Sequence, residues 1–203
     1  MLLWTSLVPE PNDPRKAKWI TAAHRPSGQE AWQITFDATT PVELLHDIHA
    51  DLLDLYLEDR HSDQDPLYGD ETAPYEAYAP LLSCGWSHDV KTDGTQTFLA
   101  PEGLGGVRHR YAPGFLHGLA WRAWGGYLSE PQWQARFSSG TPTTLVAAFT
   151  ASLISTEPVR RTAKDVPFYT RHHLNIATAT AKQPPGYSPA APPPSGPRPG
   201  PTR

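Results

Sequence analysis

The sequence predicts an α+β protein made of two copies of one unit, each an antiparallel sheet of about five strands with one C-terminal helix packed on one face, the first copy being shortened. Two observations support this fold class. A block of sequence recurs 101 positions later, and in each block the two-residue period of a strand precedes the spacing of a helix. The length of 203 residues, 38% of them hydrophobic, allows one ordinary domain or two small ones and excludes a large multidomain enzyme.

The repeat consists of six identities in thirteen aligned positions without a gap. The matched residues are Trp32, Gln33, Phe36, Thr40, Pro41 and Leu44 in the first copy, and Trp133, Gln134, Phe137, Thr141, Pro142 and Leu145 in the second. Conservative apolar pairs, such as Ile48 with Phe149, continue the register. Matches of this density indicate an internal duplication.

In the first copy, the repeated block predicts a strand followed by a capped helix. Apolar and polar residues alternate over residues 32–36, as in a half-buried strand. Thr40 is expected to be the helix N-cap, with Pro41 at the first helical position and Glu43 completing a capping box. An apolar stripe over residues 44–55 then predicts that the helix lies on the sheet.

The second copy is expected to contain four strands before its repeated block. Their ranges are 86–90, 95–100, 107–111 and 119–127. Asp93-Gly94 favours a tight hairpin between the first two of these strands. The first copy is shorter, because Leu7-Val8-Pro9-Glu10 resembles Leu99-Ala100-Pro101-Glu102 and therefore places the start of the chain within the second strand of its unit.

A strand that is missing from the first copy would leave a sheet edge with unpaired N–H and C=O groups. Such an edge promotes aggregation unless another segment covers it. We expect the other unit or another chain to cover it, and self-association through this edge is one expectation about partners.

The remaining segments are expected to connect or extend the two units. The predicted division is a truncated first unit at 1–57, an acidic linker at 58–80, a second unit at 81–156, an extension at 157–182 and a disordered proline-rich tail at 183–203. The tail contains 9 of the 23 prolines and no acidic residue, so it has too little apolar surface to fold. It is expected to be a solvated spacer or, alternatively, a docking peptide in the polyproline II conformation.

A family resemblance is carried by residues 131–142, PQWQARFSSGTP, and residues 145–150, LVAAFT. These segments closely resemble the SPDY domain, a family of unknown function found mainly in Streptomyces and related actinobacteria, often in tandem. Trp86 and Trp121 fall where that family has other characteristic tryptophans. The family's Ser-Pro-Asp turn is Ala100-Pro101-Glu102 in this sequence. The resemblance implies a tandem fold and no established activity.

Charge is distributed unevenly along the chain. Residues 1–80 carry 15 acidic and 5 basic side chains, a net charge of −10, whereas residues 81–203 carry 6 and 12, a net charge of +6. In the predicted helix of the first copy, Asp47, Asp51 and Asp54 are expected to point away from the apolar stripe. The overall charge of −4 is therefore the sum of an acidic first part and a basic second part of the chain.

Arginines in the second copy follow the strand period. Arg108, Arg110, Arg122 and Arg136 occur at positions that alternate with Val107, His109, Trp121 and Phe137, among others. This alternation predicts that all four arginines lie on the sheet face away from the helix, and that Trp124 shares that face.

The arginine-bearing face has several interpretations. It could bind phosphates and stack a nucleic-acid base on Trp124. Alternatively, the arginines keep a solvated face soluble, or they meet the acidic residues of the first unit in a domain interface. The overall negative charge argues against strong nonspecific binding to duplex DNA.

Other candidate sites have weaker signals. His46 and His49 share a helix side, but their spacing lacks the glutamate of a His-Glu-x-x-His zinc helix, so no metal site is expected. Ser83, Cys84 and His88 are close in sequence without a nucleophile motif, so no catalytic residue is assigned. A single cysteine excludes an internal disulfide and fits a reducing cytoplasm.

The sequence therefore favours a cytoplasmic, non-catalytic interaction module with no cofactor and no membrane attachment. Its partner is an unknown macromolecule, protein or nucleic acid, and the candidate binding residues are those of the arginine-bearing face. The alternatives are a structural protein–protein or dimerisation module without a nucleic-acid role and, less favoured, a hydrolase-type enzyme.

Overall fold

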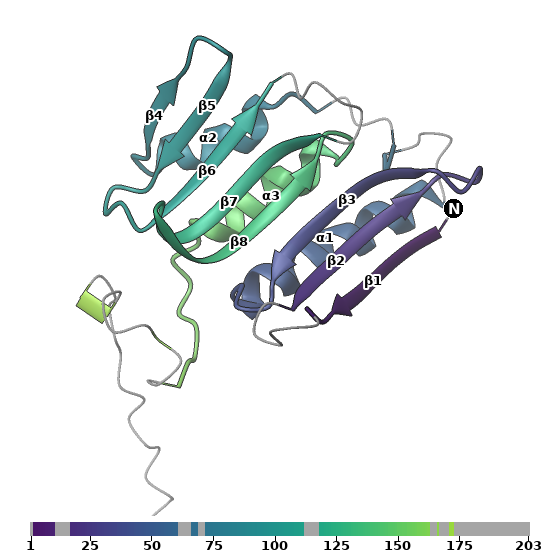
Figure 1. Cartoon of the computed structure of the whole chain (residues 1–203), viewed down its shortest axis with the longest axis horizontal. Helices are drawn as coiled ribbons and strands as arrows, with labels where there is room; N and C mark the ends of the chain where they lie inside the picture. The colour runs from purple at the N-terminus through teal and green to yellow at the C-terminus, as the bar shows by residue number, and fades with distance from the viewer. Residues whose placement is uncertain are drawn as a thin grey trace, which may run out of the picture. The chain divides into compact units, whose positions relative to one another are not determined.

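The computed structural model of the chain describes residues 2–10, 17–60, 66–68, 72–111, 118–162, 166 and 171–172. In this part of the chain, eight strands form one antiparallel sheet, and three helices pack on one of its faces (Figure 1). The predicted α+β class with repeated sheet-and-helix units is confirmed.

The strands follow the chain in two groups. The first group is β1 (Leu2–Val8), β2 (Lys18–His24) and β3 (Glu30–Asp37), followed by the helix α1 (Val42–Asp59). The second is β4 (Ser87–Val90), β5 (Thr95–Leu99), β6 (Gly105–Arg110), β7 (Leu119–Tyr127) and β8 (Glu130–Ser138), followed by α3 (Thr143–Leu153). A further helix, α2 (Tyr75–Ser83), precedes β4. The order in the sheet is β1-β2-β3-β8-β7-β6-β5-β4, so the two groups meet at β3 and β8.

The repeated strands β3 and β8 pair with each other and join the two copies into one sheet. Their register pairs Ile34 with Phe137, Thr35 with Arg136, and Phe36 with Ala135. Because the repeat offset is 101 residues, Thr35 and Arg136 are equivalent positions, and the two flanking pairs exchange when the copies are exchanged. The seam between the copies therefore has a local twofold axis at the Thr35–Arg136 pair.

Hydrogen bonds across this seam follow the same symmetry. Thr40 Oγ1 donates to the carbonyl oxygen of Gln134, and the equivalent Thr141 Oγ1 donates to that of Gln33, both at 3.5 Å. The prediction that Thr40 caps α1 is wrong, because Pro41 occupies the N-cap position without a side-chain cap. The threonine hydroxyl instead bonds to a backbone carbonyl of the other copy.

The two copies also share one hydrophobic core on the helix-facing side of the sheet. Trp32, Phe36, Phe137 and Phe149 are each at most 1% exposed. The ring of Phe149 in α3 lies 6.1 Å from that of Phe36 and 5.3 Å from that of Phe137. One helix of the second copy therefore packs on strands of both copies, and neither core is closed by its own unit alone.

The position of β1 differs from the prediction. β1 pairs with β2 as β6 pairs with β7, with Thr5 opposite Thr21 where the second copy has Val107 opposite Ala123. β1 is therefore equivalent to β6, the third strand of the second group, and the described residues of the first copy contain no counterparts of β4 and β5. In the described part of the chain, β1 is an edge of the sheet that the other unit does not cover. Coverage by another chain stays a prediction.

The interval expected to be an acidic linker contains packed structure. Leu67 is fully buried, and its carbonyl oxygen accepts a 2.8 Å hydrogen bond from Trp32 Nε1. The helix α2 then packs Tyr78 against Phe98 and Trp121, at ring-centroid distances of 4.9 and 5.4 Å. The acidic composition and the prolines of this interval are typical of a linker, so the sequence did not predict the helix. The predicted tail, 183–203, lies outside the described residues.

A polar pair is buried beneath α2. The Tyr78 hydroxyl hydrogen-bonds to Nδ1 of His109, and the His109 ring stacks on Trp121 at 3.8 Å. Burial lowers the pKa of His109 to about 4 and raises the pKa of Tyr78 to about 12. The imidazole is therefore neutral near pH 7, and its Nδ1 shares a hydrogen bond with the Tyr78 hydroxyl whose direction depends on the imidazole tautomer.

Acidification is expected to destabilise the protein through His109. The pKa of this side chain is 6.5 without the protein environment and about 4 in the fold, so the unfolded chain binds the proton more tightly. The stabilising contribution is complete well above pH 6.5 and is lost as the pH falls toward 4, by roughly 3 kcal/mol. Urea denaturation across this range measures the loss. His109→Gln should remove this part of the pH dependence, and an unchanged pH dependence in the variant would contradict the assignment.

The seam between the copies is expected to tolerate no side chain at Gly140. A Cβ there would lie 2.3 Å from the carbonyl oxygen of Ala31, so Gly140→Ala should lower the free energy of unfolding by about 1–3 kcal/mol. The control is Thr39→Ala, at the equivalent position of the first copy, which removes only the 2.7 Å hydrogen bond from Thr39 Oγ1 to the carbonyl oxygen of Gln132. Its effect should stay below about 1 kcal/mol. Equal effects of the two changes on the free energy of unfolding, measured by chemical denaturation, would contradict the close approach of Gly140 to the carbonyl oxygen of Ala31.

Candidate anion-binding face

Three arginines lie directly opposite one another on neighbouring strands of the second copy. The sheet register pairs Arg136 of β8 with Arg122 of β7, and Arg122 with Arg108 of β6. Val107, on the alternate face, belongs to the core beneath the helices. We call Arg108, Arg122 and Arg136 the arginine row; it lies on the outer face of the sheet, away from the helices. Arg110 lies two residues after Arg108 and shares this face.

The arginine row has few partners in the described part of the chain. Arg108 Nε donates to Thr97 Oγ1 at 3.4 Å, and Arg136 Nη2 donates to Gln134 Oε1 at 3.1 Å. Nε of Arg122 is buried and has no hydrogen-bond partner. None of the three ion pairs in this part of the chain includes an arginine of the row. The guanidinium groups therefore keep unused donors.

The charges of the row act on one another. Burial lowers the pKa of Arg122, and the neighbouring charges of Arg136 and Arg108 lower it further, while Asp37 opposes these effects. Like charges directly opposite each other in a sheet destabilise the fold. The row is therefore a local concentration of positive charge that no described residue neutralises through an ion pair.

Trp124 lies on the same outer face but is buried. Its side chain is 1% exposed, and the ring occupies the space over Gly106, where a Cβ would lie 2.0 Å from Cζ2 of the tryptophan. Arg108 Cζ and Arg122 Cζ each lie 5.9 Å from the centroid of this ring. Trp124 therefore supports the arginines by cation–π contact. It does not present a free surface on which a nucleic-acid base could stack.

The cross-strand positions in line with the arginine row can be followed across the whole sheet. Among them, only positions of the second copy carry positive charge. From β1 to β4, the cross-strand positions are Ser6, Ile20, Thr35, Arg136, Arg122, Arg108, Thr97 and Asp89. Under the local twofold axis, Thr35, Ile20 and Ser6 are the equivalents of the three arginines. The two copies therefore share a sheet geometry and differ in surface chemistry.

Among the acidic residues of the first copy, Asp37 acts on Arg122 through its charge, but those of α1 do not face the arginine row. Asp47, Asp51 and Asp54 belong to α1, which packs on the opposite face of the sheet. Burial raises the pKa of Asp51, and the neighbouring Asp54 and Asp47 raise it further. The interpretation that the arginines pair with the acids of the first unit in a domain interface is therefore wrong for this helix.

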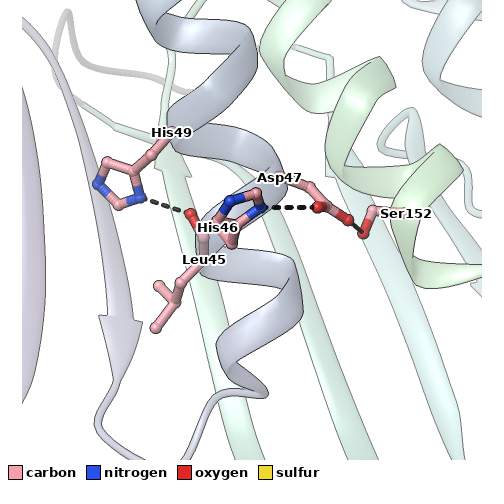
Figure 2. Close-up of polar contacts among 5 residues, drawn as sticks. All are labelled: Leu45, His46, Asp47, His49 and Ser152. Atoms are coloured by element: carbon pink, nitrogen blue, oxygen red, sulfur yellow. Dashed lines mark hydrogen bonds and ion pairs between the residues drawn. The ribbon is translucent and has the colours of Figure 1, made fainter. Parts of the chain in front are cut away.

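The histidines of α1 have structural partners (Figure 2). His49 Nδ1 hydrogen-bonds to the carbonyl oxygen of Leu45 at 2.5 Å, and His46 Nδ1 lies 3.3 Å from Asp47 Oδ1. Asp47 contacts the neighbouring helix, because its Oδ2 accepts a 2.5 Å hydrogen bond from Ser152 Oγ of α3. This bond lowers the pKa of Asp47. Among the described residues, no group of three or more His, Cys, Asp or Glu side chains is placed to hold a metal ion.

The residues considered for hydrolytic chemistry have separate partners. Ser83 Oγ donates to the carbonyl oxygen of Pro80 at 2.7 Å, His88 Nε2 lies 3.0 Å from Gln96 Oε1, and Cys84 is exposed. The structure does not bring these three side chains into hydrogen-bond contact with one another within the described residues.

A pocket of about 470 Å³ lies elsewhere, between the start of α1 and residues 159–162. Glu43 lines it and forms an ion pair with Arg161, so Glu43 does not complete the capping box that the sequence predicted. The other carboxylate oxygen, Oε2, is buried without a partner.

The described fold defines a class, the two-layer α+β proteins in which a sheet-and-helix unit is duplicated. The family model of SPDY, described as a domain of unknown function (DUF317), matches residues 2–57 and 100–159, more than half of the chain. The chain belongs to this family and contains two tandem copies. The second match contains β6, β7, β8 and α3 and leaves out β4 and β5. No curated protein and no solved structure matches the chain.

No helix in the described ranges combines the length and the apolar character that crossing a membrane requires.

Relieving the repulsion within the row is expected to stabilise the protein. Arg122→Leu removes the central charge and keeps an apolar stem against Trp124, so it should raise the free energy of unfolding by about 0.5–1 kcal/mol at low salt. The gain should shrink at about 0.5 M salt, where the wild-type charges are screened. Arg110→Leu is the matched control, because Arg110 is exposed and opposite Thr95. Thermal and urea unfolding at two salt concentrations measure both effects, and destabilisation by Arg122→Leu at low salt would contradict this account.

Proposed function

We propose that this chain is a non-catalytic interaction module that binds a polyanionic macromolecule, in the first place nucleic acid, through the arginine row. One observation carries the proposal. Three arginines occupy opposite positions on three adjacent strands, and none of them forms an ion pair with a described residue. An arrangement that disfavours the folded state without a ligand is typical of a functional site.

The chemistry of the row suits phosphate groups. A guanidinium group donates two parallel hydrogen bonds to an oxyanion, and such charge-assisted bonds are stronger than neutral ones. Neighbouring strands lie about 4.8 Å apart, so the three arginines span roughly 10 Å across the sheet. A contact of this size fits a few successive phosphates of a strand rather than an extended duplex surface.

Fluorescence anisotropy with labelled single-stranded and duplex DNA tests the proposal. Binding to the wild-type protein should weaken clearly between about 50 and 200 mM salt, because each phosphate contact releases a counterion. The variant Arg108→Ala/Arg122→Ala/Arg136→Ala should lose at least about tenfold in affinity.

A charge-matched variant separates the row from the effect of net charge. Arg25→Ala/Arg60→Ala/Lys91→Ala removes the same three positive charges at exposed positions of other elements, and it should change the affinity less than about twofold. Binding that is insensitive to salt, or equally weakened in both triple variants, would reject the arginine row as the binding site.

A further inference from the structure

We infer that the arginine row binds a linear chain of phosphate groups and does not read the bases attached to it. This inference rests on the proposed function and specifies its ligand. The shared chemistry is a series of phosphate oxyanions, which a single nucleic-acid strand and inorganic polyphosphate both supply.

The first argument is that the outer face around the row offers no free aromatic surface in its described part. On β6 and β8, the positions two residues from an arginine of the row are Gly106, Arg110, Gln134 and Ser138. On β7, the aromatic residue two positions from Arg122 is Trp124, which is 1% exposed. Binding of single strands through their bases depends on exposed aromatic side chains, because successive bases stack on them. This face lacks that element.

The second argument concerns the faces of the guanidinium groups. A guanidinium plane can itself stack on a base. Here Arg108 Cζ and Arg122 Cζ both lie 5.9 Å from the centroid of the Trp124 ring. Two of the three arginines therefore already use an aromatic partner of the protein, and what they offer a ligand is their N–H donors.

The third argument is the supply of donors along the row. Nε of Arg122 is buried without a partner, while Arg108 and Arg136 each hydrogen-bond to one neutral side chain, Thr97 and Gln134. Oxyanions satisfy such donors with charge-assisted bonds. Residues opposite each other in a sheet are about 5 Å apart, so a phosphate chain that runs across the strands can place successive oxyanions on successive arginines.

The row also limits the length of the contact. Its neighbours on β3 and β5 are Thr35 and Thr97, which carry no charge. Three phosphate contacts predict that log K falls with log salt concentration with a slope of about −2 for a single strand.

Competition and direct binding with three phosphate ligands test the inference on the full chain. The probes are labelled oligothymidylate of about 12 nucleotides, an oligomer of the same length made only of abasic nucleotides, and inorganic polyphosphate as competitor. The abasic oligomer should bind within about twofold of oligothymidylate, and polyphosphate should displace both. For both oligomers, the salt slope should be about −2 with the wild-type protein and near zero with Arg108→Ala/Arg122→Ala/Arg136→Ala. The control Arg25→Ala/Arg60→Ala/Lys91→Ala should retain the wild-type slope.

The outcomes separate this inference from the proposed function. If oligothymidylate binds through the row at least about tenfold more tightly than the abasic oligomer, bases are read and the inference is overturned, while the proposed function stands. Failure of polyphosphate to compete overturns it in the same way. If the wild-type protein binds none of the three ligands, both the inference and the proposed function are overturned.

Discussion

The antiparallel pairing of β3 with β8 is the constraint on which the rest of this structure depends. The two strands are the same segment of the repeated unit, so their pairing relates the copies by a local twofold axis at Thr35 and Arg136. The axis brings α1 and α3 together on one face, where Phe149 packs on strands of both copies. Without this pairing, each copy would expose an unpaired strand edge and half of an aromatic core.

One sheet also means one continuous outer face, and the two copies use it differently. In the second copy, the ring of Trp124 on β7 lies over Gly106 on β6; at the equivalent pair of the first copy, Trp4 stands on β1 and Ala22 on β2. The large and small residues have thus exchanged strands. In the second copy the tryptophan lies next to Arg108 and Arg122, whereas the equivalent positions of the first copy are Ser6 and Ile20. The duplication conserves the backbone pairing and leaves the surface chemistry free to diverge.

Local patterns in the sequence predicted the units but not their connection. The two-residue period located the strands and placed the four arginines on one face, because alternation is a property of each strand alone. Strand order, the equivalence of β1 and β6, and the role of Thr40 depend on contacts between distant segments, which no local pattern contains. The same holds for the candidate site. That the three arginines of the row are directly opposite one another follows from the register of β6, β7 and β8, and the burial of Trp124 depends on the absence of a side chain at Gly106.

The charge pattern of the row is the reason to propose a binding role for it and not a role in solubility alone. A sheet face needs charged side chains of both signs, interspersed, to remain soluble. Opposite charges on neighbouring strands attract each other, whereas like charges directly opposite each other destabilise the sheet. Arg122 instead has a like charge on each side and a buried Nε without a partner. A threonine, as at Thr35 in the same cross-strand row, would fill such a position without the repulsion. An anion that bridges the three guanidinium groups would convert the repulsion into binding energy, so the feature that weakens the free protein is the one that would strengthen its complex.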